Sequence, residues 1–267
     1  MANALNAGGI TCHRILALGD TGSGKTSQFL TIPGKKFAYL FDPNALLSLQ
    51  GHDVEYEEFF PDRLNMSAQS LAKDKGDKNS NHRSDAYGRW EKDFNARLDG
   101  GFFDDVDAIA MDSATTFLDL IMDRVLTING RYGSVPQQDD YGPQMLAFTN
   151  VCRQLTALGK TIYFTGHMET KQDDLTKRIF NRPMLTGKLR VKIPLLFTSV
   201  FLFDAMEAQG KIKHRIQTAP DRLNSTVRTS IKGLDAFEDV TIDWTKPPVG
   251  QGLGGILAWE KSELLKK

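Results

Sequence analysis

Eight residues near the start of the chain constrain its fold more than any other stretch. They follow the apolar run at residues 15–18, spell the pattern G-x-x-x-x-G-K-[ST], and are Gly19, Asp20, Thr21, Gly22, Ser23, Gly24, Lys25 and Thr26. The glycines let the backbone curl so that its N–H groups cradle phosphate oxygens. Lys25 would then reach the β- and γ-phosphates of ATP, and the Thr26 hydroxyl would ligate Mg²⁺. The pattern predicts a buried strand, a phosphate-binding loop and a helix whose positive N-terminal end faces the phosphates.

Five apolar runs predict buried strands, at residues 14–18, 36–41, 106–111, 161–165 and 198–203. Between the third and fourth runs, residues 114–128 and 144–158 carry apolar side chains at helical spacing. Strands that alternate with helices indicate an α/β fold, with a mainly parallel sheet and helices on both faces. We expect one domain over residues 1–245, and a C-terminal tail over 246–267 that docks through Trp244 and Trp259. Polar composition predicts mobile loops at about 73–84, 130–142 and 171–192.

Charge and cysteine content restrict the possible partners and the cellular location. The 267 residues include 33 Lys plus Arg and 33 Asp plus Glu, so no overall charge attracts nucleic acid or a membrane. Any polyanion must therefore bind to a local patch. Cys12 and Cys152 lack metal-type spacing and fit a reduced, cytoplasmic protein. We expect no signal peptide and no membrane span.

Asp112 follows the third apolar run, where a metal-organising carboxylate is expected at the carboxyl edge of a parallel sheet. Its expected role is to hold Mg²⁺ through a water molecule or through Thr26. The alternative is that Asp112 caps the helix that starts at Ser113 and Ala114, although Ser113 could be the cap instead.

Polar residues also end the fourth and second runs. His167 would sense the γ-phosphate or polarise the attacking water, and the alternative is a solvated loop histidine. Several acidic residues are candidates for orienting the attacking water. Asp42 ends the second run, and the acidic residues that follow it are Glu55, Glu57 and Glu58. Most acidic residues in such a stretch are simply solvated, so the sequence does not show which of these carboxylates would orient the water.

A basic segment follows His167. Residues 171–192 hold seven Lys and Arg against two Asp, a net charge of plus five. Such a segment would track a nucleic-acid backbone, with Phe180 available for base stacking. The candidate contacts are Lys177, Arg178, Arg182, Lys188 and Arg190. The alternative is an exposed loop with solvated charges.

The order of these motifs resembles the RecA-like branch of P-loop ATPases. The run at residues 106–113 resembles the RecA Walker B strand with its Asp-Ser end. The later motifs are similar to a family of phage-encoded RecA-like ATPases that includes single-strand annealing recombinases. These motifs are Asp140-Tyr141-Gly142, Gly166-His167-Met168, Thr186-Gly187-Lys188-Leu189 and Ile193-Pro194. The resemblance covers roughly residues 10–240.

The resemblance implies a RecA-like core, ATP binding and hydrolysis with Mg²⁺, and a context of DNA recombination. It places Arg228 where relatives carry a basic residue that acts on a neighbouring subunit's ATP, which implies a ring or filament. One position departs from the pattern. RecA proteins carry a catalytic Glu in an Asp-x-Glu context, whereas this chain has Asn44 after Asp42 and Pro43. Because an amide cannot take a proton from water, hydrolysis would be slow or would use another carboxylate.

Two classes of function follow from these features. The leading one is an ATPase that binds single-stranded DNA and assists recombination, annealing or replication. The other is an assembly or structural protein whose nucleotide controls oligomerisation without DNA. A small-molecule kinase is a weaker third reading, because the chain lacks an evident Arg-rich lid with a site for an acceptor substrate.

Overall fold

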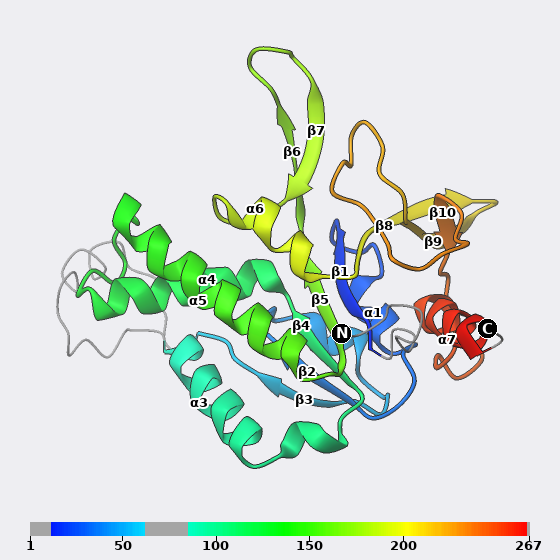
Figure 1. The fold of residues 1–267 in the computed structure, drawn as a ribbon, viewed down its shortest axis with the longest axis horizontal. Coiled ribbons are helices and arrows are strands. Elements are labelled where there is room, and N and C mark those ends of the chain that lie inside the picture. Colours follow the sequence, from blue (N-terminus) through cyan, green and yellow to red (C-terminus); the bar gives the residue numbers. More distant parts are fainter. Residues whose placement is uncertain (1–11, 62–84, 266–267) are drawn as a thin grey trace, which may run out of the picture.

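A computed structural model of the protein describes residues 12–61 and 85–265. It contains one large sheet, a separate two-stranded hairpin and helices on both faces of the sheet (Figure 1). The expected loop at 73–84 lies outside the described residues. The expected fold class, an α/β core with a mainly parallel sheet, is confirmed.

The large sheet has the strand order β10-β9-β8-β1-β5-β4-β2-β3. The parallel strands are β1 (Arg14–Gly19), β2 (Lys36–Leu40), β3 (Glu55–Glu58), β4 (Ala108–Asp112), β5 (Thr161–Gly166) and β8 (Ser199–Ala208). The strands β9 (Lys211–Gln217) and β10 (Phe237–Asp239) extend this sheet in antiparallel fashion. Five of these strands correspond to the five apolar runs. Strands β3, β9 and β10 match none of the apolar runs. β3 and β10 are short and mostly exposed, and the first three residues of β9 are exposed.

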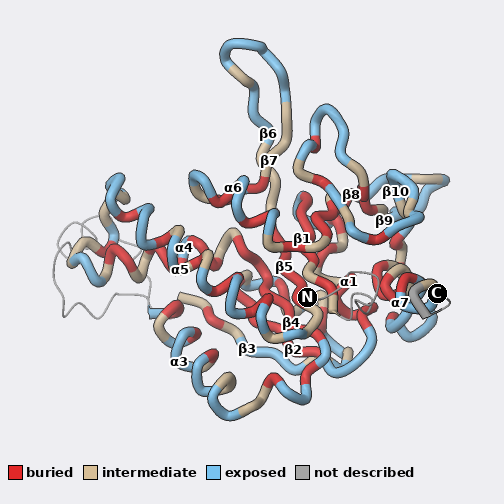
Figure 2. Tube along the Cα trace, viewed as in Figure 1, coloured by how far each residue is buried: buried red, intermediate tan, exposed pale blue. Residues whose placement is uncertain are grey.

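Alternate side chains of each central strand enter two different cores. Leu16 and Leu18 of β1 pack on the side of α3 (Ala86–Asp99), α4 (Ala114–Ile128) and α5 (Gln138–Ala157). Ile15 and Ala17 pack on the side of α1 (Lys25–Phe29) and α7 (Gly252–Leu265). This period of two is the pattern of a sheet that is buried on both faces. Burial is accordingly concentrated in the sheet and decreases toward the periphery (Figure 2).

Short 3₁₀ turns connect several of these elements. They are η2 (Ala45–Ser48), η3 (Phe102–Asp105) and η4 (Pro194–Leu196). Among the described residues, no helix is both long and apolar enough to cross a bilayer.

The helix expected at 144–158 begins earlier than predicted, and this shortens the expected loop at 130–142. Helix α5 starts at Gln138, and Asp140 in its first turn is fully buried. The Asp140 carboxylate accepts hydrogen bonds from Gln137 N at 2.7 Å, from Asn129 Nδ2 at 3.0 Å and from Arg131. The polar residues that suggested a loop are therefore a capped first turn of helix.

Half of the expected loop at 171–192 is regular structure. Strands β6 (Met168–Gln172) and β7 (Ile179–Pro183) form an antiparallel hairpin that projects from the body, and α6 (Leu189–Lys192) follows it (Figure 1). Most side chains of this hairpin are exposed or only partly buried. A ribbon without a buried face lacks the apolar alternation by which strands are recognised in a sequence.

The C-terminal segment is a docked helix and not a tail. Helix α7 packs on α1 through Leu253 and Leu257, which are buried. Trp244 and Trp259, the expected anchors, are 57% and 42% exposed. The glycines that indicated an irregular tail instead permit close approach, because a Cβ at Gly254 would lie 1.8 Å from the carbonyl oxygen of Thr31.

Candidate functional site

The phosphate-binding loop connects β1 to α1 at the carboxyl edge of the sheet. The loop buries Lys25, whose Nζ donates to the carbonyl oxygens of Gly19 at 2.9 Å and Asp20 at 2.7 Å. Burial lowers the pKa of Lys25, and the nearby carboxylates of Asp112, Asp20 and Asp42 partly oppose this shift. Lys25 thus lies within the loop, where a phosphate could replace the carbonyl oxygens as its partner. Helix α1 has only five residues, so its dipole adds less than predicted.

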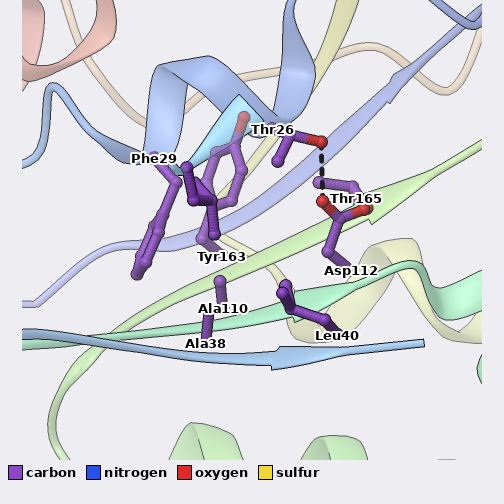
Figure 3. A pocket seen from close by; sticks show the side chains of 9 residues that line it. Thr26, Phe29, Ala38, Leu40, Ala110, Asp112, Tyr163 and Thr165 are labelled. Carbon is purple, nitrogen blue, oxygen red and sulfur yellow. Dashed lines mark hydrogen bonds between the residues drawn. The ribbon is translucent and has the colours of Figure 1, made fainter. Parts of the chain in front are cut away.

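Asp112 lies directly beside the phosphate loop. Its Oδ2 accepts a hydrogen bond of 2.6 Å from the Thr26 hydroxyl, and its Oδ1 accepts one from Thr165 (Figure 3). Asp112 is only 5% exposed, and burial raises the pKa of its carboxylate, against the effect of the two hydroxyl hydrogen bonds. The helix-cap alternative does not hold, because the Ser113 side chain caps α4 by accepting from Thr116 N.

Thr26 and Asp112 present the hard oxygen atoms that Mg²⁺ prefers. Within residues 12–61 and 85–265, no group of three or more His, Cys, Asp or Glu could hold a metal ion. Mg²⁺ is usually held by one or two protein ligands together with waters and substrate phosphates. Both Asp112 oxygens are hydrogen-bonded to hydroxyls, which fits a carboxylate that would act on the ion through Thr26 or water.

Two further predicted residues lie at the same edge of the sheet. Asp42 follows β2, where Leu40 is in register with Asp112, and its carboxylate accepts a hydrogen bond from the Thr116 hydroxyl. His167 follows β5, and its backbone N–H donates to the Thr115 hydroxyl at 3.2 Å. The fold therefore brings Asp42, Asp112 and His167 to the ends of three adjacent strands around the phosphate loop.

The other acidic candidates differ in their surroundings. Glu55 pairs with Lys35 at 3.1 Å, and Glu57 pairs with Arg97 at 2.9 Å. Glu58 is opposite Leu40 in the β2–β3 register, near the carboxyl edge. Asn44 precedes the η2 turn and its side chain makes no cap hydrogen bond. The geometry thus favours Asp42 over Glu55 and Glu57 as the residue near the site.

Three residues that contact this site were not predicted. Thr165 donates to Asp112, as described above, and the Tyr163 hydroxyl donates to the Lys25 carbonyl oxygen at 2.7 Å. His214, on β9, places Nδ1 3.1 Å from the Ser23 carbonyl oxygen. A Cβ at Gly24 would lie 2.9 Å from this Nδ1, and Gly24 has a φ of 88°, so both space and backbone require glycine there. Of the three, only Tyr163 and Thr165 had a sequence signal, because they alternate along an expected strand.

The predicted nucleic-acid contacts do not form one free cationic row. Arg182 donates to Glu169 at 2.8 Å, and Arg190 lies 3.7 Å from the same carboxylate. Arg178 donates to the carbonyl oxygen of Arg222 at 2.6 Å. Lys177 and Lys188 are exposed. Glu169 lies just before residues 171–192, so the net charge of that segment does not include the carboxylate that neutralises its arginines.

Arg228 is not near the phosphate loop of its own chain. Its backbone pairs with Val200, near the start of β8, and its guanidinium donates to the carbonyl oxygens of Pro194 at 2.7 Å and Phe197 at 2.9 Å. A role on a neighbouring subunit's ATP stays a prediction, and it would require these two hydrogen bonds to break.

Comparison with known proteins places this site in a family. A family model described as "AAA domain" matches residues 12–226. The flagellar accessory protein FlaH from Methanocaldococcus jannaschii is a similar solved structure, with 16% identity, 88% of each chain covered and a TM-score of 0.42. A KaiC-like protein from Pyrococcus horikoshii OT3 has 12% identity, with 89% of this chain and 87% of that chain covered, and a TM-score of 0.40. No curated protein matches the chain.

Proposed function

The chain belongs to the AAA domain family, and from that premise we propose that it binds and hydrolyses ATP and acts on single-stranded DNA. The observation that carries the ATPase part is the hydrogen bond of 2.6 Å between Thr26 and Asp112, which joins the phosphate loop to the end of β4. The DNA role, in recombination, annealing or replication, rests on the sequence resemblance and on the projecting β6–β7 hairpin with its exposed Lys177 and Arg178. A phage-encoded recombination protein is the context that the resemblance implies.

Each residue of the site has a proposed role. Backbone N–H groups from Gly19 to Gly24 would hold the phosphates, and Lys25 would turn from its carbonyl partners to the β- and γ-phosphate oxygens. Thr26 would ligate Mg²⁺, with Asp112 behind it. A bound Mg²⁺ would neutralise phosphate charge.

Activation of the attacking water is the step for which the site has no matching catalytic Glu. Asp42 is the predicted carboxylate whose charge helps to raise the pKa of Asp112, and it would orient the attacking water and accept its proton. Asn44 stands where the resemblance places a catalytic Glu, and an amide cannot take a proton from water. His167 would report on the γ-phosphate at the foot of the hairpin. We therefore propose slow hydrolysis that DNA or a neighbouring subunit stimulates.

The test is phosphate release from ATP and Mg²⁺, measured with and without single-stranded DNA. Stimulation by the oligonucleotide supports the whole proposal. Turnover that single-stranded DNA does not change supports the ATPase and removes the DNA role. The absence of both ATP binding and turnover would contradict the assignment of the phosphate loop.

A second function, nucleotide-controlled assembly of the protein into a ring or filament without DNA, is favoured by one observation. Leu175 at the tip of the β6–β7 hairpin is 95% exposed, and Ile179 on the same hairpin is 51% exposed. Exposed apolar side chains on a projecting arm suit a contact with another copy. Light scattering with ATP and with ADP tests this, since a mass that does not depend on nucleotide would contradict it.

A further inference from the structure

A cleft lies between the β6–β7 hairpin and the loop that joins β9 to β10. It has a volume of about 490 Å³ and is lined by Asp173, Thr176, Arg178, Phe180, Arg222 and Ser225. The hairpin and this loop rise side by side beyond the edge of the sheet (Figure 1). None of the lining residues belongs to the phosphate-binding loop. The volume is in the range of sites that bind small molecules or parts of larger ligands.

The two arginines of the cleft lack a balancing carboxylate. Arg178 donates to the Arg222 carbonyl oxygen at 2.6 Å, which brings the two residues together. Over residues 12–61 and 85–265, no carboxylate forms an ion pair with either guanidinium. By contrast, Lys171 and Arg182 at the hairpin base both pair with Glu169. Two arginines that line one cleft without counter-charges are suited to a phosphate group.

The one carboxylate in the lining is already used by the hairpin turn. Asp173 Oδ1 accepts hydrogen bonds from Leu175 N at 3.1 Å, from Thr176 N at 2.7 Å and from the Thr176 hydroxyl at 2.9 Å. These hydrogen bonds, above all those from Thr176, lower the pKa of Asp173, so the carboxylate remains charged. The lining therefore carries two positive charges and one negative charge, and the negative charge is held by hydrogen bonds within the hairpin turn.

Phe180 adds an aromatic surface beside the two arginines. Its ring is partly exposed on β7, and the Ser225 hydroxyl is on the opposite wall of the cleft. Guanidinium groups, a hydroxyl and an aromatic ring are the groups that bind a backbone phosphate and stack on its base. We propose that this cleft binds one phosphate and the adjacent base of single-stranded DNA, an inference that rests on the proposed DNA role.

Hydrogen bonds hold the two walls of the cleft in place. Asn181 N donates to the Leu223 carbonyl oxygen at 2.8 Å, and Asn181 Nδ2 donates to Asn224 Oδ1 at 2.8 Å. Asp221 Oδ1 accepts from Leu223 N at 2.8 Å and from Asn224 N at 2.6 Å. A cleft whose walls are already ordered loses less conformational entropy when a ligand binds.

This site differs from the basic row that the sequence predicted. Of the five residues in that row, only Arg178 lines the cleft, and Arg182 and Arg190 lie near Glu169 instead. Arg222 lies 44 residues from Arg178, on a different loop, so no local pattern connected the two. The main DNA contact therefore moves from the base of the hairpin to its outer half and the facing loop.

The experiment measures binding of a fluorescent oligo-dT to the full chain by anisotropy, over a series of salt concentrations. Arg222→Ala removes one guanidinium and leaves the carbonyl oxygen that anchors Arg178. We expect it to weaken binding at low salt about 5- to 20-fold and to reduce the salt slope by about one. Phe180→Ala should weaken binding about 5- to 150-fold by removing a stacking partner, and Phe180→Trp should restore it.

Lys92→Ala is the matched control, since it removes one exposed positive charge on α3, outside the cleft, and should weaken binding no more than about twofold. Circular dichroism and ATP binding confirm that each variant is folded. If the parent protein binds DNA but Arg222→Ala and Phe180→Ala bind equally well, the cleft is excluded and the DNA role stands. Equal losses in Arg222→Ala and Lys92→Ala would also exclude the cleft, in favour of a diffuse charge effect. If the parent protein binds no oligo-dT at low salt, the DNA role itself fails.

Discussion

Thr26 and Asp112 are 86 residues apart, and their side chains share a hydrogen bond of 2.6 Å. One ends the phosphate-binding loop and the other ends β4, which is separated from β1 by β5 in the sheet. The remaining oxygen of Asp112 accepts from Thr165 on that intervening strand. The site therefore depends on the register of three neighbouring strands as well as on the loop motif.

The role of the Thr26 hydroxyl can be separated from the role of the side chain's shape. Thr26→Val keeps the branched side chain but cannot ligate a metal ion, whereas Thr26→Ser keeps the hydroxyl. We expect Thr26→Val to raise the Mg²⁺ concentration needed for half-maximal ATP turnover about 10- to 100-fold, and Thr26→Ser to change it only a few-fold. The measurement is phosphate release over a Mg²⁺ series. A normal Mg²⁺ requirement in Thr26→Val would exclude Thr26 as a ligand.

Lys25→Ala should lower ATP turnover at least about 100-fold, because it removes a charge placed for the transferred phosphate. The variant also loses the hydrogen bonds to Gly19 and Asp20, so its thermal unfolding is measured alongside. Lys35→Ala, which removes a half-exposed lysine paired with Glu55, is the control and should keep full turnover. Unchanged turnover in Lys25→Ala would mean that the phosphate-loop assignment is wrong.

Much of the site was predictable because its signals are local. The eight-residue motif and Asp112 at the end of an apolar run could be read directly, since the ends of parallel strands meet at one edge of the sheet. His214 and Arg222 could not, because each acquires its partner across 191 and 44 residues respectively. The β6–β7 hairpin was also missed, because a ribbon exposed on both faces has no apolar periodicity. Tertiary contacts, which a single sequence does not reveal, thus determine which Lys and Arg side chains have a carboxylate partner.

The Asp123 carboxylate on α4 predicts a stability that depends on pH. Burial, together with the charge of Asp119, raises the pKa of Asp123 to about 6. The folded protein thus binds this proton more tightly than the unfolded chain, whose aspartates titrate near about 3.9. Stability is therefore lost as pH rises from roughly 4 to 6, and the full cost is present at pH 7.

Asp123→Asn removes that cost. We expect its Tm at pH 7.5 to rise by about 2–5 °C, which corresponds to about 1–1.5 kcal/mol after a discount for partial exposure. The gain should shrink toward zero at pH 4, where the native carboxyl is already protonated. Asp99→Asn, an exposed aspartate at the end of α3, is the control. A gain in Tm that is the same at pH 4 and pH 7.5 would contradict this account.

His214 is expected to position the phosphate loop. Because a carbonyl oxygen can only accept, Nδ1 must donate to Ser23, and an Asn amide can replace that donor. His214→Phe should weaken binding of a fluorescent ATP analogue about 3- to 10-fold, the loss of one hydrogen bond, and His214→Asn should stay within about twofold. Lys211→Ala, at the exposed start of the same strand, is the control. Equal losses in the Phe and Asn variants would show a packing role and no hydrogen-bonding role.

The docking of α7 on α1 depends on Gly254. A Cβ at this position would lie 1.8 Å from the Thr31 carbonyl oxygen, and backbone atoms cannot move aside as a flexible side chain can. Gly254→Ala should therefore destabilise the protein by about 1–3 kcal/mol and lower Tm by roughly 2–10 °C. Gly142→Ala is the matched control, since a Cβ there meets nothing within 4 Å and α5 should gain about 0.5–1 kcal/mol. An unchanged Tm in Gly254→Ala would mean that α7 does not pack this closely in solution.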